Sequence, residues 1–111
     1  KSLDAIRSLA LSDGLIEVID LRTLNPVDLD LIEISITKTN KVLIVHEDNI
    51  TNGPGAEISA IISDKFFELL DGPIRRVAAK DSPVPFNWHI EEVILPQTAD
   101  VANAISEILE Y

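Results

Sequence analysis

The sequence contains no cysteine, no methionine and only two histidines among its 111 residues. Without cysteine there is no disulfide, no thiolate metal ligand and no thiol nucleophile. The two histidines, His46 and His89, are far apart in the sequence, so a structural zinc site is not expected. No Ser/His/Asp set and no carboxylate pair at helical spacing emerges. We therefore expect neither a catalytic centre nor a metal site in this chain.

Positive charge is scarce: 9 Lys and Arg face 19 Asp and Glu, which gives a formal net charge of −10. Such a surface repels phosphate groups, so we do not expect nucleic-acid binding, whereas a basic protein partner would suit it. Long apolar runs are also missing. None approaches the roughly 20 residues of a membrane span, and no apolar stretch of a signal peptide follows Lys1–Asp4. By default, these absences predict a cytoplasmic protein without membrane contact.

Aromatic residues are few, and aliphatic side chains supply most of the apolar content. The apolar pattern alternates between helical and strand periods along the chain. Strands separated by helices require parallel crossovers, which predicts an α/β fold of three layers with a mainly parallel sheet covered on both faces. We expect residues 1–111 to form a single domain. The expected helices lie near 2–12, 28–40, 58–69 and 101–108, the strands at 16–20, 41–46 and 74–79, a turn at 47–55 and a loop at 80–96.

The segment at 28–40 fits two patterns. Residues Ile32–Thr37 alternate as in a strand, while Leu29, Ile32 and Ile36 share one face of a helix. Asp28 could cap the start of a helix and Asn40 its end. Length and these caps favour the helix.

Two features near the end of the second expected strand could carry chemistry. The turn with Gly53 and Gly55 precedes a helix, whose free amides could hold an anion; the alternative, which we favour, is a turn that lets the helix approach the sheet. His46 could act as a general base at the carboxyl end of the strand, with Glu47 as its partner. Neighbouring strand residues point to opposite faces, however, so a structural role for His46 is the commoner outcome.

The loop after the third expected strand contains Asp81, Pro85 and Phe86. Its prolines stiffen it, so it either presents an aromatic anchor to a partner or covers the domain's own core. At the other end of the chain, Glu107, Glu110 and the carboxylate expected at Tyr111 place negative charge at a helix C-terminus, where it opposes the helix dipole. This cost is offset if a basic partner binds there; the alternative is a solvated acidic face.

Several ordered motifs resemble the transketolase C-terminal domain family, especially the β subunits of 2-oxoacid dehydrogenase E1 components. The resemblance covers residues 2 to 111. Val45–Glu47 and the final Tyr lean toward the branched-chain type, beside the pyruvate and acetoin types. The motifs are Glu17–Asp28 (E-V-I-D-L-R-T-L-x-P-x-D), Lys38–Lys41, Val45–Glu47, Gly53–Ile58 (G-x-G-A-E-I), Asp71–Val77, Asp81–Phe86 and Ile94–Pro96.

The resemblance implies a parent enzyme that decarboxylates a 2-oxoacid on thiamine diphosphate with Mg²⁺ and acylates the lipoyl group of the E2 component. In such enzymes the cofactor lies outside this domain, so the chain alone is expected to be inactive. The implied partners are the E1 α subunit, a second β copy and the E2 subunit-binding domain. The resemblance places E2 contacts at Asp71 and Tyr111, and the loop positions Gly53, Gly55, Glu57, Asp81, Pro85 and Phe86 are further interface candidates.

One family feature is missing from the sequence: the domain's first strand, of the type V-T-I-V-x-Y-G. We therefore expect a fragment of a longer E1 chain whose sheet lacks that strand and exposes an edge. Two alternatives remain open. One is the C-terminal domain of a transketolase or deoxyxylulose-phosphate synthase, without an E2 contact. The other is a free-standing flavodoxin-like ligand-binding or regulatory domain, with its ligand near His46 and Gly53.

Overall fold

The computed structural model describes residues 1–9, 15–22, 26–81 and 93–111. Their centre is a parallel ladder of two strands, β1 (Leu43–Asn49) and β2 (Arg75–Ala79). Val45 aligns with Val77, and after an irregularity Asn49 aligns with Ala79. β1 therefore runs three residues further than the expected 41–46, into the segment expected to be a turn.

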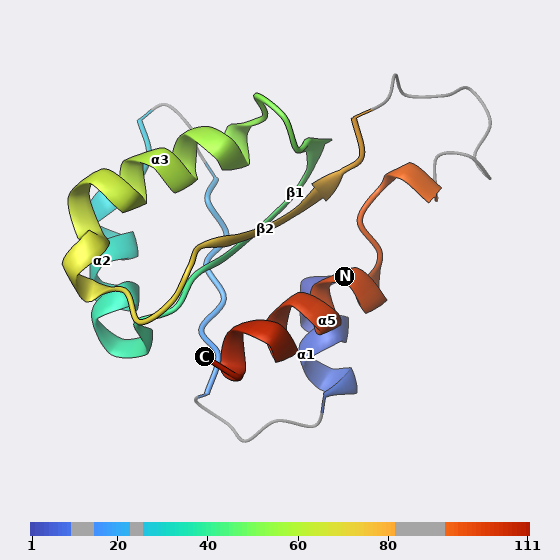
Figure 1. Cartoon of the computed structure of the whole chain (residues 1–111), viewed down its shortest axis with the longest axis horizontal. Helices are drawn as coiled ribbons and strands as arrows, with labels where there is room; N and C mark the ends of the chain where they lie inside the picture. Colours follow the sequence, from blue (N-terminus) through green and yellow to red (C-terminus); the bar gives the residue numbers. More distant parts are fainter. Residues whose placement is uncertain (10–14, 23–25, 82–92) are drawn as a thin grey trace.

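Helices cover both faces of this ladder (Figure 1). On one face α2 (Leu29–Thr39) and α3 (Pro54–Phe66) enclose a core of buried aliphatic residues with Phe66. A short 3₁₀ helix, η1 (Phe67–Leu69), follows α3. On the other face α1 (Ser2–Ser8) packs with α5 (Thr98–Leu109) over a second cluster. The expected three-layer α/β fold is confirmed.

Side chains of β1 alternate between these two cores because successive strand residues point to opposite faces. Val42 and Ile44 pack against the α2–α3 cluster, whereas Leu43 and Val45 pack against the α1–α5 cluster. The ladder is thus packed on both faces, as expected for a parallel sheet.

The segment with the ambiguous pattern is helical, as expected. Asp28 caps α2 because its Oδ1 accepts a hydrogen bond from the amide of Leu31 at 3.1 Å. Asn40 ends the helix in the left-handed conformation, with φ of 59°, and its amide donates to Ile36 O at 2.8 Å. Both caps agree with the residues chosen from the sequence.

The strand expected at residues 16–20 is not formed. Among the described residues, Ile16–Leu21 make no backbone hydrogen bond with β1 or β2, although Ile16 and Leu21 pack against the two different cores. Glu17 also reaches α2, where Lys38 Nζ lies 3.4 Å from its Oε1. An alternating pattern places side chains correctly but does not supply the neighbouring strand that a ladder needs. The described part of the sheet consequently leaves one edge of β1 open.

None of the helices in the described ranges is long and apolar enough to cross a membrane.

Candidate functional site

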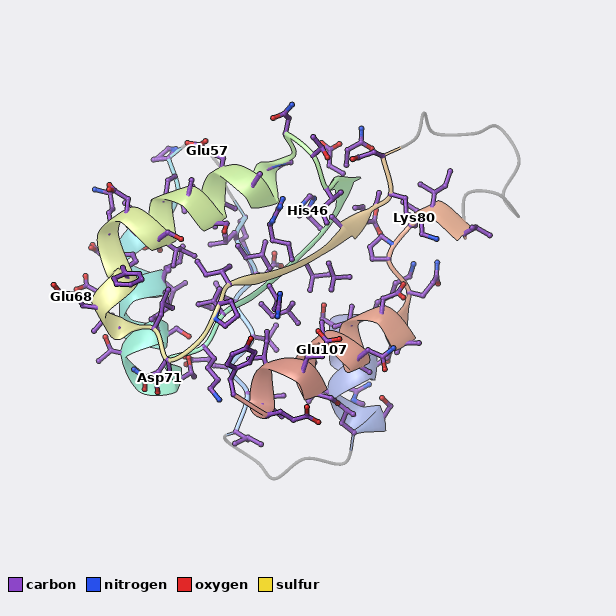
Figure 2. All side chains as sticks on the ribbon, viewed as in Figure 1. His46, Glu57, Glu68, Asp71, Lys80 and Glu107 are labelled. Carbon is purple, nitrogen blue, oxygen red and sulfur yellow. The ribbon has the colours of Figure 1, made fainter. Side chains whose placement is uncertain are left out.

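Asp71 and Tyr111 are 40 positions apart in the sequence but lie close together, because the Tyr111 ring contacts Gly72, the residue that follows Asp71. The Tyr111 ring packs on this glycine so closely that a Cβ at Gly72 would lie 3.4 Å from its Cγ. The main chain reaches this point because the Tyr111 amide continues the last turn of α5, donating to Ile108 O at 3.2 Å. Asp71 lies at the end of the sheet where β1 and β2 begin (Figure 2). Because the Tyr111 ring contacts Gly72, Tyr111 shares this surface with Asp71.

Two residues between α2 and β1 complete this surface. The main-chain oxygen of Asn40 accepts a hydrogen bond from the Asp71 amide at 2.8 Å, and its Nδ2 donates to Leu69 O at 2.8 Å. Lys41 Nζ donates to the main-chain oxygen of Tyr111 at 2.7 Å. We call these four residues with Gly72 the amino-end surface. From the sequence, Asn40 is expected to cap α2 and both Asn40 and Lys41 fall in the Lys38–Lys41 motif, but neither is expected to contact Asp71 or Tyr111.

The amino-end surface is open to solvent and predominantly acidic. Asp71 is exposed, Tyr111 is 63% exposed, and the exposed carboxylate of Glu110 precedes Tyr111. Lys41 brings a cation into this surface, but it already contacts Tyr111. The side chain of Asp71 makes no hydrogen bond or ion pair within the described residues, so its carboxylate can meet a cation of another molecule.

Toward the carboxyl end of β1, by contrast, the space beneath α3 is filled. The His46 ring fills the space beneath the first turn of α3, where a Cβ at Gly55 would overlap the ring and a Cβ at Gly53 would overlap Asn49 O. Glycine at these two positions therefore allows α3 to approach β1. Both ring nitrogens of His46 are buried and have no hydrogen-bond partner among the described residues.

The environment of His46 favours the neutral ring. Burial lowers its pKa, the nearby carboxylate of Asp48 acts in the opposite direction, and the cation of Arg76 lowers the pKa further. A general base must reach the proton that it removes. The buried nitrogens of His46 do not offer that access. We therefore assign the ring a packing role against α3.

Asp81 ties the turn after β1 to the end of β2. Its Oδ1 accepts from the Thr51 amide at 3.0 Å, and its second oxygen accepts from the Thr51 hydroxyl. Hydrogen bonds from the Thr51 hydroxyl and amide lower the pKa of Asp81. Beside it, Arg76 Nη1 donates to Ile50 O at 2.6 Å. The other two candidates of that loop, Pro85 and Phe86, lie outside the described residues.

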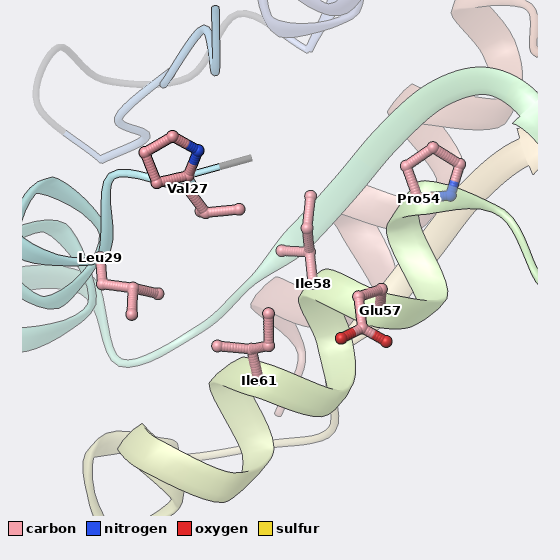
Figure 3. A pocket seen from close by; sticks show the side chains of 7 residues that line it. Val27, Leu29, Pro54, Glu57, Ile58 and Ile61 are labelled. Atoms are coloured by element: carbon pink, nitrogen blue, oxygen red, sulfur yellow. The ribbon is translucent and has the colours of Figure 1, made fainter. Parts of the chain in front are cut away.

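Glu57 lies in the first turn of α3 and is exposed. It borders a hollow of about 440 Å³ that is otherwise apolar (Figure 3). A second hollow, of about 430 Å³, lies between the end of β2 and the start of α5. Neither hollow includes Asp71 or Tyr111. The lining of the first consists of Pro26, Val27, Leu29, Pro54, Glu57, Ile58 and Ile61.

Within the part of the chain that the structure describes, no three His, Cys, Asp or Glu side chains gather as metal ligands would. We assign no chemical step to the described residues.

Comparison with known proteins gives a consistent picture. A family model described as "Transketolase, C-terminal domain" matches residues 1–101. The pyruvate dehydrogenase E1 component subunit beta of Rickettsia felis is 41% identical over 110 residues, which are 99% of this chain and 34% of that protein. The acetoin:2,6-dichlorophenolindophenol oxidoreductase subunit beta of Bacillus subtilis is 40% identical over 93 residues, 84% of this chain and 27% of that protein.

The mitochondrial pyruvate dehydrogenase E1 subunit beta of Dictyostelium discoideum is 39% identical over 94 residues, 85% of this chain and 26% of that protein. Among solved structures, one titled "Split gene transketolase, inactive beta4 tetramer" superposes with a TM-score of 0.75. It is 24% identical and covers 98% of this chain and 34% of its own, so it supports the fold alone. The chain spans about a quarter to a third of the length of these relatives.

Proposed function

The chain belongs to the transketolase C-terminal domain family, and on that premise we propose that it is the assembly and E2-docking domain of an E1 β component. The parent enzyme is a thiamine-diphosphate-dependent 2-oxoacid dehydrogenase, which decarboxylates its substrate oxidatively and acylates the lipoyl group of E2. The names of the relatives, two of them pyruvate dehydrogenase subunits at about 40% identity, favour pyruvate over a branched-chain substrate. Residues 1–111 act as a single domain of that enzyme.

In this proposal the chain contributes binding surface and no reacting group. Thiamine diphosphate with Mg²⁺ would be held elsewhere in the parent enzyme and would supply the chemistry of decarboxylation there. The domain's own partners are the E1 α subunit, a second β copy and the subunit-binding domain of E2. The isolated chain is expected to have no activity.

The observation that carries the docking role is the juxtaposition of Asp71 and Tyr111 at the amino-end surface. The two positions were chosen from family resemblance, and the fold places them side by side, exposed, in a chain of net charge −10. An exposed carboxylate beside an exposed aromatic ring suits a basic protein surface, because complementary charge speeds encounter and selects the partner while the ring supplies contact area.

The alternatives gain no specific support. A flavodoxin-like domain would hold its ligand near His46 and Gly53, where the His46 ring fills the space. A transketolase-type domain would make no E2 contact, and the transketolase neighbour is informative on fold only.

The test is binding of the intact protein to an isolated E2 subunit-binding domain, measured by calorimetry at two salt concentrations. Asp71→Lys should abolish detectable binding at moderate salt, because it places a cation where the partner brings one. Glu47→Lys is the matched control. It makes the same change of charge on β1, about 20 Å from the amino-end surface at about 3.3 Å per strand residue. This variant should bind as the unmodified protein does. Equal affinity of Asp71→Lys and the unmodified protein would refute the docking role.

A further inference from the structure

Asn40 and Lys41 are neighbours in the sequence, and each contacts one of the two residues assigned to the docking surface. Asn40 bonds to the Asp71 amide, and Lys41 to the Tyr111 main-chain oxygen. The loop before β2 and the end of α5 are thereby attached to consecutive residues between α2 and β1. Among the hydrogen bonds of the described residues, no other short stretch of chain is bonded to both of these segments.

Asn40 fixes the loop that carries Asp71 at two points. Its Nδ2 donates to Leu69 O and its main-chain oxygen accepts from the Asp71 amide, both at 2.8 Å. These bonds flank Leu70, whose side chain packs against the α2–α3 core. The positive φ of Asn40, 59°, turns both groups toward the same loop, and asparagine tolerates this conformation better than most residues. The Asp71 backbone is therefore held to the end of α2 while its side chain remains exposed.

Lys41 holds the other half of the surface. Its Nζ reaches the Tyr111 oxygen at 2.7 Å across a sequence separation of 70 residues. The Tyr111 ring rests on Gly72, so the end of α5 meets the Asp71 loop on one side and Lys41 on another. In the last turn of that helix, the side chain of Ile108 is buried.

We propose that Asn40 and Lys41 are positioning residues that hold Asp71 and Tyr111 at a fixed separation, so that one basic protein surface meets both together. The inference rests on the proposed docking function and adds a physical requirement to it. A surface that is ordered before binding loses less conformational freedom when the partner arrives. Loss of either contact should consequently weaken binding by about three- to tenfold, mainly through faster dissociation.

Lys41 offers a test in which positioning and charge have opposite effects. Lys41→Met removes the cation and makes the surface more acidic, so electrostatics alone predicts tighter binding to a basic partner. Positioning predicts weaker binding, with a faster dissociation rate in surface plasmon resonance. Lys41→Arg keeps both charge and donor and should restore the dissociation rate of the unmodified protein. If Lys41→Met binds as tightly as the unmodified protein or more tightly, Lys41 does not position Tyr111.

Asn40→Gly tests the other contact. Glycine keeps the positive φ and the main-chain oxygen but removes the bond from Nδ2 to Leu69 O. Amide hydrogen exchange should become faster at Asp71 and stay unchanged at Val77 within the β ladder, and the partner should dissociate faster. Unchanged exchange at Asp71 would show that Asn40 does not hold this loop.

Asp71→Lys serves as the reference in the same binding experiment on the intact protein. If the unmodified protein does not bind the E2 domain, the docking function fails, and the inference fails with it. If it binds, and Asp71→Lys does not, while Asn40→Gly and Lys41→Met dissociate at the unmodified rate, only the positioning role is refuted.

Discussion

The two ends of the β ladder differ in what their polar groups contact. At the carboxyl end, where open α/β sheets usually bind ligands, three polar side chains make contacts within the chain: His46 lies under α3, Arg76 bonds to Ile50 O, and Asp81 bonds to Thr51. At the amino end, main-chain groups are bonded while Asp71 and the Tyr111 ring face solvent. The two ends therefore differ in which polar groups are left for a partner, and the proposed docking function uses the amino end.

Among the substitutions that test this difference, Gly53→Ala should have the largest effect on the free energy of unfolding. A Cβ at this position would overlap the main-chain oxygen of Asn49, which cannot move without disturbing β1. We expect a loss of about 2 kcal/mol in the free energy of unfolding, measured by urea denaturation. Gly72→Ala is the control at the amino end, because its Cβ would meet the Tyr111 ring at an ordinary distance of 3.4 Å. Similar losses in the two variants would contradict the difference in packing.

His46 should make a smaller contribution to stability, which appears as a pH dependence of the unfolding free energy. Its pKa in the folded protein is below the ordinary 6.5, so the unfolded chain binds a proton that the folded chain excludes. Stability from the neutral ring is therefore present above about pH 6.5 and is lost as pH falls from there toward the lowered pKa. The unfolding free energy should decline over this range, and His46→Leu should remove that part of the decline. An identical pH profile for the His46→Leu variant would show that the ring is not excluded from protonation.

The smallest effect concerns Asp81, which is exposed, so we expect its signature in titration rather than in overall stability. The hydrogen bonds from Thr51 hold the pKa of Asp81 below its ordinary 3.8. Thr51→Val removes the hydroxyl donor, and the pKa of Asp81, followed by carboxyl ¹³C NMR, should rise toward that ordinary value. Because a lowered carboxyl pKa stabilises the fold only above it, the contribution disappears as pH falls through the folded-state pKa. No change in the titration would mean that the amide bond alone lowers the pKa.

Local sequence patterns were sufficient where the determinants of structure were local. The cap at Asp28 and the left-handed Asn40 define α2, and the sequence alone indicates both as its ends. The strand at 16–20 failed for a non-local reason: its alternation is real, since Ile16 and Leu21 reach different cores, but the described chain provides it with no ladder partner.

The amino-end surface shows the same division between local and non-local determinants. Asp71 and Tyr111 came from resemblance to a family and not from any periodicity, and their contact through Gly72 depends on how α5 crosses the sheet. The bond from Lys41 to Tyr111 spans 70 residues and leaves no local signature. A left-handed Asn before a strand was the one available sign that a loop would be attached there.

The pairing of β1 with β2 also has a consequence for how the chain folds. Two parallel strands cannot be joined by a tight turn. Here α3 and η1 lie between β1 and β2 in the sequence, so a long loop must close before Leu43 pairs with Arg75. Closing that loop costs entropy before any ladder bond is made, so we expect the helices to form early and the ladder late. Substitutions such as Val77→Ala in β2 should then accelerate unfolding more than they slow refolding, with φ-values near zero. Until the ladder closes, the unpaired backbone of β1 is a site where chains can associate wrongly during synthesis.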